Sequence, residues 1–129
     1  MVSWKQYVDN ALLSNHAIKR AGIFGVVGSV KDYACVNFAP LIEEVNVLAD
    51  AFADPRHVVA NGLKMEGDTY VCLMTNSNTI RARLANRGLV AAKTHRCVVV
   101  VVYEDVAKYS NSVMTTVAKL ANYLTAHDF

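Results

Sequence analysis

Apolar residues recur at helical spacing near the start of the chain. Val8, Ala11 and Leu12 form a stripe, and Trp4 and Tyr7 lie three residues apart, so they share one helix face. A serine followed three residues later by a glutamine, at positions 3–6, has the pattern of a capping box and predicts the helix start. Two aromatics this close to a chain end have two interpretations: packing against another helix, or an aromatic binding surface.

The next segment has the outline of a β-hairpin. Residues 21–27 and 33–36 are apolar and partly β-branched, with turn residues between them. Gly22, Gly25 and Gly28 recur every three residues, but they lack the spacing of a nucleotide-binding loop. We interpret them as strand glycines that let another element pack closely.

An amphipathic helix is predicted to begin at Pro40 and to end before Asp54-Pro55. Its first turn carries two glutamates, which the helix dipole favours. The expected core stripe is Ile42, Val45, Ala49 and Phe52.

From Val58 onward the pattern indicates short strands separated by tight turns, which predicts an antiparallel meander. Ile80, Ala82 and Leu84 alternate with Arg81 and Arg83, so we expect the two arginines side by side on an open sheet face. The predicted turns are 61–62, 66–68, 76–78, 86–88 and 93–96.

Residues 97–103 are apolar without alternation, so both faces of this strand should be covered, with helices on both sides of the sheet. A last helix is predicted over 110–129. Its core stripe is Val113, Val117, Leu120 and Leu124. Because the termini of compact domains often lie close together, the terminal helices should gather an aromatic patch. The expected members are Trp4, Tyr7, Tyr123 and Phe129.

The composition fits a single compact domain spanning residues 1–129. Of these residues 53% are hydrophobic and 19% charged, and no apolar run approaches the ~20 residues of a membrane span. No signal peptide pattern is visible, and Cys35, Cys72 and Cys97 form no Cys-x-x-Cys pair. These features favour the cytoplasm, with thiols that behave as small hydrophobes.

The charge is unevenly distributed although the net charge is only +2. Between Thr69 and Tyr103 there is no acidic residue but there are five basic ones. This asymmetry indicates either an electropositive face toward an acidic partner or an ordinary solvated sheet face.

No catalytic motif is present. The four histidines lack metal-ligand spacing, and His95 and Cys97 belong to a strand region where a structural role outweighs a Cys–His nucleophile. We therefore expect neither an enzyme nor a cofactor or metal site.

Four stretches carry a family resemblance: Ser3-Trp4-Lys5-Gln6-Tyr7-Val8-Asp9-Asn10, Asn61-Gly62-Leu63, Gly88-Leu89-Val90 and Leu120-Ala121-Asn122-Tyr123-Leu124, with an aromatic final residue. Through them the chain resembles the profilin family over essentially its whole length. The resemblance implies an α+β fold: a central antiparallel β-sheet with the N- and C-terminal helices on one face and shorter helical structure on the other.

The same resemblance implies a monomeric cytoplasmic and cytoskeletal protein. It would bind monomeric actin, promote nucleotide exchange on actin and regulate polymerisation. It would also bind proline-rich segments of formins and similar actin regulators, and acidic phosphoinositides, but no nucleic acid. The implied polyproline groove is Trp4, Tyr7, Asn10, Tyr33, Tyr123, Leu124 and Phe129. Tyr33 stands where the family usually has tryptophan and Phe129 where tyrosine is common, so we expect a weaker groove. Helix–helix core packing is the alternative interpretation of these aromatics.

The implied actin surface departs further from the family, with Met74 at a position often arginine and Ala118 at a position often aromatic. Its candidates are Val59, Ala60, Thr69, Val71, Met74, Arg83, Lys93, Asn111, Thr115, Ala118 and Lys119. The phosphoinositide candidates are Arg81, Arg83, Lys93 and Arg96, for which plain solubility is the alternative. Two rival functions stay open: a polyproline-binding scaffold with weak or lost actin binding, and a small-ligand sensor module with an interior pocket.

Overall fold

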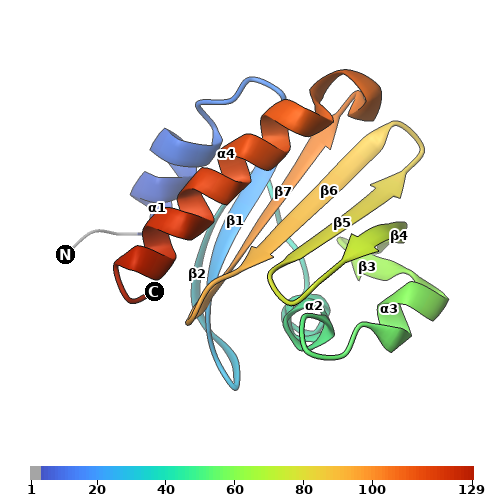
Figure 1. Ribbon diagram of the computed structural model, residues 1–129, viewed down its shortest axis with the longest axis horizontal. Helices are drawn as coiled ribbons and strands as arrows, with labels where there is room; N and C mark the ends of the chain where they lie inside the picture. The colour runs from blue at the N-terminus through green and yellow to red at the C-terminus, as the bar shows by residue number, and fades with distance from the viewer. Residues whose placement is uncertain (1–3) are drawn as a thin grey trace.

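The computed structural model describes residues 4–129 and contains one seven-stranded antiparallel sheet in the order β2-β1-β7-β6-β5-β4-β3. Helices α1 (Trp4–Tyr7), η1 (Val8–Leu12) and α4 (Val106–Ala126) lie across one face (Figure 1). Helices α2 (Ile42–Ala51) and α3 (Arg56–Asn61) pack on the other. The strands are β1 (Ile18–Val27), β2 (Ser29–Val36), β3 (Leu63–Met65), β4 (Asp68–Thr75), β5 (Thr79–Leu84), β6 (Arg87–Lys93) and β7 (Cys97–Glu104). The predicted fold class is confirmed.

Strand β7 divides the interior into two cores, as its unbroken apolar run predicts. Cys97, Val99 and Val101 belong to the core under the terminal helices. Val98 and Val100 belong to the core under α2 and α3, and all five residues are almost fully buried. Because successive strand residues face opposite sides, a strand in the middle of the sheet needs apolar side chains at every position.

The terminal helices differ in detail from the expectation. The first helix continues from α1 into a π-helical turn, η1, which closes with a hydrogen bond from the Leu13 amide to the Val8 carbonyl. The predicted capping box rests on Ser3, which lies outside the described residues. Helix α4 begins at Val106, so the predicted start at Ser110 is wrong by one turn: the amides of Lys108 and Tyr109 already donate to the carbonyl of Asp105.

Helix α2 begins two residues after the predicted start at Pro40. Its buried apolar residues are Val45, Leu48 and Ala51, with Phe52 buried just after the last turn, whereas Ile42, expected in the core, is exposed. The stripe is shifted because Glu44 also points inward. This carboxylate is only 6% exposed and accepts hydrogen bonds from three backbone amides, those of Leu41, Glu66 and Gly67, at 2.8–3.0 Å.

Helix α3 differs from the expectation of a strand and a turn over residues 58–61. Gly62 follows it with φ 87° and ψ 167°, a backbone conformation that glycine adopts readily and other residues do not. The strands and turns from β3 to β7 otherwise match the predicted meander.

The β1–β2 hairpin is confirmed, and two of its glycines are close-packing positions. A side chain at Gly22 or Gly25 would meet Cys35 or Asp32 on the paired strand. Gly28 is not a close-packing position as predicted. It occupies the turn, with a φ of 76° and open space around it.

Candidate functional site: an aromatic groove between the terminal helices

Four aromatic rings gather where α1 meets the end of α4. The Trp4 ring lies 5.1 Å from Phe129 in an edge-on arrangement and 6.2 Å from Tyr7. Tyr7 lies 5.8 Å from Tyr123. The structure therefore brings together the four residues expected in the aromatic patch, two from each end of the chain.

The polar atoms of this cluster are already partly engaged. The Trp4 indole N–H donates to Oδ2 of Asp32 at 2.9 Å, so strand β2 fixes the orientation of the ring. Burial, followed by the neighbouring Tyr123 hydroxyl, raises the pKa of Tyr7 above its ordinary value of 10.0. The Tyr7 hydroxyl therefore stays neutral over the physiological pH range.

Phe129 is held in place through its backbone. Its carbonyl oxygen accepts hydrogen bonds from Thr94 Oγ1, at 2.7 Å, and from the Arg96 amide, and its own amide donates to the Leu124 carbonyl. Leu124 is 0% exposed and belongs to the core cluster against which Trp4, Tyr7 and Phe129 pack. Asn10 is exposed on η1 and is not among the residues that line the hollow beside the cluster.

Tyr33 does not join the groove. It is directly opposite Phe24 in the β1–β2 pair, and their rings are 5.9 Å apart. Phe24 belongs to the core under α2 and α3, so Tyr33, which is 59% exposed, lies on the far face of the sheet from Trp4. The assignment of Tyr33 to the polyproline groove is therefore corrected: on this strand Asp32 is the residue that reaches Trp4.

The cluster opens into a hollow of about 450 Å³ between η1 and α4. Its walls are Tyr7, Ala11, Ser14, Thr116, Lys119, Leu120 and Tyr123. We call this hollow, together with Trp4 and Phe129, the terminal-helix groove. His127 was not among the predicted groove residues, and its ring stacks on Tyr123 at 4.1 Å. The spacing of four residues on one helix was the available signal.

The candidate actin residues divide between elements. Val71 is the direct partner of Arg83 and Met74 that of Arg81, so these side chains share the sheet face that carries α4. Thr69, on β4, and Asn111, Thr115 and Ala118, on α4, are exposed as well. Val59 and Ala60 are exposed on α3, which packs on the other side of the sheet. Lys119 instead lines the terminal-helix groove.

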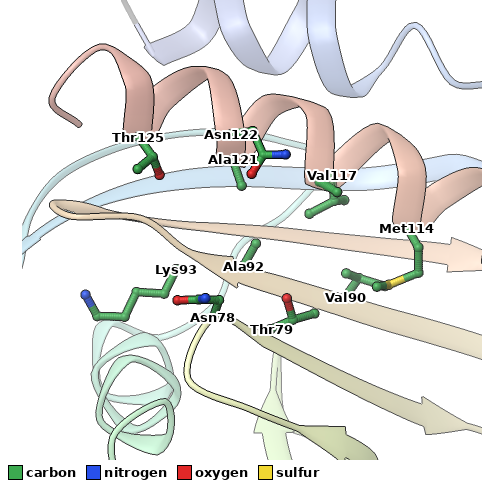
Figure 2. Close-up of a pocket in the computed structure, with 11 residues that line it drawn as sticks. Asn78, Thr79, Val90, Ala92, Lys93, Met114, Val117, Ala121, Asn122 and Thr125 are labelled. Carbon is green, nitrogen blue, oxygen red and sulfur yellow. The ribbon is translucent and has the colours of Figure 1, made fainter.

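A cleft of about 220 Å³ separates α4 from strands β5 and β6 on this face (Figure 2). Small side chains on α4, Ala118, Ala121 and Thr125, leave the space open above Val90 and Ala92. Lys93 stands at one end of the cleft, and its ammonium donates to the Thr94 carbonyl at 3.0 Å.

The four candidate phosphoinositide residues form two pairs. Arg81 donates to Ser110 Oγ on α4 at 3.2 Å, so it lies against this helix, not on the open face expected from the alternation; Arg83 beside it is exposed. Lys93 and Arg96 lie at the β6–β7 turn, where they line a second hollow with His95 and Asp50 of α2.

Two findings concern other kinds of site. In residues 4–129, no group of three or more His, Cys, Asp or Glu side chains could hold a metal ion. None of the helices in the described part of the chain is long and apolar enough to cross a bilayer.

Taken together, the fold and the groove define a class: a small α+β binding protein that presents an aromatic surface between its two terminal helices. Comparison with known families agrees with this class. The family model described as Profilin matches residues 2–129. The chain belongs to the profilin family.

Individual relatives are similar over nearly their whole length. Profilin of Drosophila melanogaster is 31% identical over 95% of this chain and 96% of its own. The crystal structure of Acanthamoeba castellanii profilin II matches at a TM-score of 0.88 with 28% identity, covering 98% of this chain and all of the other. Mouse profilin IIa, solved in complex with a double repeat from the FH1 domain of mDia1, shares the fold at 16% identity and a TM-score of 0.75, over 99% of this chain and all of that one.

Proposed function

We propose that this protein binds proline-rich segments of formins and similar actin regulators in the terminal-helix groove. The observation that carries the proposal is the cluster of Trp4, Tyr7, Tyr123 and Phe129 over Leu124. A polyproline II helix is preformed, and its rings pack on flat aromatic surfaces while its carbonyls accept hydrogen bonds from hydroxyl and indole donors. The complex of mouse profilin IIa with an FH1 repeat supports this choice of ligand.

Helix–helix core packing is the alternative account of these rings. It is disfavoured because Tyr123 is 46% exposed and Tyr7 lines an open hollow, whereas residues of the core proper are almost fully buried.

The groove is tested by titrating the protein with poly-L-proline and recording tryptophan fluorescence. Trp4 is the sole tryptophan of the sequence, so its emission reports on the groove directly. We expect a saturable change that Tyr7→Ala or Phe129→Ala abolishes. The matched control is Tyr33→Ala, which should bind normally because Tyr33 lies on the other sheet face. No change at millimolar proline concentration, with the protein folded by circular dichroism, would refute the proposal.

We propose monomeric actin as the second partner, with nucleotide exchange on actin and control of its polymerisation as the outcome in the cytoplasm. Membership of the profilin family supports this partner. The surface we propose is the α4 side of β4 and β5 with the adjoining cleft, where Val71 is 65% exposed and Met74 and Arg83 lie beside it. An exposed apolar patch bordered by a cation is typical of a protein-binding surface.

A pull-down with monomeric actin distinguishes this function from a proline-binding scaffold that lacks actin. We expect wild type to retain actin and Val71→Glu to lose at least about tenfold in affinity, as for a central interface residue. Val71→Glu should still bind poly-L-proline, since the groove is on the other side of α4. Retention of poly-L-proline without any actin binding by wild type would favour the scaffold.

Phosphoinositide binding is a third proposal, and the β6–β7 turn is the surface we favour. Lys93, His95 and Arg96 line one hollow there, whereas Arg81 is engaged with Ser110. Clustered cations near a surface attract anionic headgroups. Sedimentation with vesicles containing phosphatidylinositol bisphosphate should retain wild type and lose Arg96→Glu, with Arg83→Glu as the comparison. Equal sedimentation of all three proteins would contradict this surface.

A further inference from the structure

The terminal-helix groove is longer than its aromatic end. Beyond Tyr7 and Tyr123 it continues between Ala11 and Ser14 on one wall and Thr116 and Lys119 on the other. The aromatic end offers flat apolar rings, and the far end offers small and polar side chains. A proline-rich ligand that follows the groove therefore leaves the rings and enters a different chemical environment.

Lys119 is the one side chain of this far end with an uncompensated charge. Its ammonium takes part in none of the five ion pairs among residues 4–129. The carboxylate of Asp9 on η1 is already paired with Lys5 at 2.9 Å. The amide of Asn15 is also occupied, because it donates to both Ser112 Oγ and Thr116 Oγ1 on α4 at 2.9 Å.

We infer that Lys119 forms a subsite for an acidic side chain that flanks the proline run of the ligand. The inference rests on the proposed polyproline function and adds a specificity element to it. Charge complementarity selects the occupant: an aspartate or glutamate neutralises the cation, and a lysine or arginine at the same place is repelled.

The spacing of the helix defines where the acidic residue must stand. Lys119 and Tyr123 are four residues apart on α4, which is about 6 Å along the helix axis. A polyproline II helix rises about 3.1 Å per residue, so a residue about two positions beyond the proline on Tyr123 reaches Lys119. A proline run has similar surfaces in both directions, and a charge at one end fixes the direction in which it lies.

The test compares three peptides of equal length by Trp4 fluorescence: a plain proline run, and the same run with two glutamates after it or before it. Their ends are acetylated and amidated so that no terminal charge interferes. The proteins are wild type, Lys119→Gln and the matched control Lys108→Gln, an exposed lysine on the first turn of the same helix. A peptide with two lysines in place of the glutamates is the charge control.

We expect at least one glutamate peptide to bind wild type on the order of two- to fivefold more tightly than the plain run, the range of an exposed ion pair. The advantage should vanish in Lys119→Gln, persist in Lys108→Gln and shrink as salt is added. If only one glutamate peptide gains, it also identifies the direction of the ligand.

Two results would overturn the inference. Normal binding of the plain run with no advantage for either glutamate peptide, or an advantage that survives in Lys119→Gln, would refute the subsite while leaving the polyproline function intact. Failure of wild type to bind the plain run would overturn the polyproline function, and the subsite with it.

Discussion

Asp32 competes with any ligand for the indole N–H of Trp4. The side chain that orients the ring is thus also the acceptor that the carbonyl of a proline-rich ligand would have to replace if it bound in the proposed groove. The ring has other support, because it packs on Phe129 and Tyr7. At the residue scale, the hydrogen-bond donor of Trp4 is therefore already paired with Asp32 in the free protein.

Replacing Asp32 with alanine should consequently tighten proline binding. We expect a gain of about 0.5–1.5 kcal/mol, the net contribution of one hydrogen bond, because the indole N–H becomes available without loss of ring packing. The measurement is the poly-L-proline titration followed by Trp4 emission, with Lys31→Ala, a change at an adjacent exposed residue, as the control. Weaker binding in Asp32→Ala would mean that ring orientation outweighs donor competition.

Cys35 gives a second prediction at this scale. Burial, followed by the nearby Glu66 carboxylate, raises the pKa of its thiol from 9.0 to about 11. The native thiolate fraction near pH 8 is then about a hundredfold lower than that of a free cysteine. Alkylation with iodoacetamide at pH 8, read by mass spectrometry of the Cys35 peptide, should be slow in the native protein and fast in urea. Equal rates would contradict the prediction.

The same shift has a consequence for stability. The thiol is neutral in both states below about pH 9, so it adds no pH dependence there. Between pH 9 and 11 the unfolded thiol ionises while the native one does not, and the free energy of unfolding should fall as pH rises. Urea titrations across this range should show a smaller fall in Cys35→Ala than in wild type.

At the scale of elements, Glu44 joins helix α2 to the β3–β4 turn. The one carboxylate accepts the Leu41 amide at the helix start and the Glu66 and Gly67 amides in the turn. Glu66 in turn pairs with Arg20 on β1 at 2.8 Å and accepts the Ala39 amide. The carboxylates of Glu44 and Glu66 thus connect α2, the β3–β4 turn and the central sheet through hydrogen bonds and one ion pair.

Glu44→Ala should therefore be strongly destabilising. Three backbone amides lose their charged acceptor at a buried position that water reaches poorly. We therefore expect the free energy of unfolding to fall by about 2–4 kcal/mol. Glu43→Ala, the exposed neighbour in the same helical turn, should cost less than about 0.5 kcal/mol. Urea denaturation followed by circular dichroism measures both. Similar values for the two variants would contradict the role of Glu44.

Some of the helices and strands could be predicted from the sequence and others could not. Strand β7 and the meander were predictable because apolar periodicity and turn residues carry direct signals. Helix α3 was not, since a six-residue helix with two adjacent valines has the composition of a strand.

The cluster of Trp4, Tyr7, Tyr123 and Phe129 was predictable, whereas the position of Tyr33 was not. The sheet face on which Tyr33 lies depends on the pairing of β1 with β2, where a shift of one residue reverses which side chains face the helices. This pairing contains an irregularity between Gly25 and Val26, and no sequence pattern reveals its position. Asp32, which does reach Trp4, was missed for the same reason.

At the scale of the whole molecule, helix α4 separates two surfaces. Thr116, Lys119 and Tyr123 face the groove, and Ala118, Ala121 and Thr125 face the cleft above β5 and β6 (Figure 2). If both proposals hold, the two partners would approach the same helix from different sides.

Simultaneous binding of both partners should follow. We expect saturating monomeric actin to change the affinity for a proline-rich peptide by less than about threefold, since no side chain would have to serve both partners. Fluorescence anisotropy of a labelled peptide, with and without actin, is the measurement, and Val71→Glu provides the control in which actin should have no effect at all. Mutually exclusive binding would show that the proposed surfaces overlap.

The order of strands in the sheet determines when the terminal-helix groove and the cleft beside α4 can form during synthesis. Strand β1 lies between β2 and β7, and Ala21 pairs with Val101, so the second partner of β1 is made last. At about 5–20 residues per second, a ribosome leaves this apolar strand edge unpaired for several seconds. Helix α4, one wall of both surfaces, follows later still. A premature stop codon before residue 97, where β7 begins, would thus yield not a weak binder but an incomplete sheet, with an edge suited to aggregation.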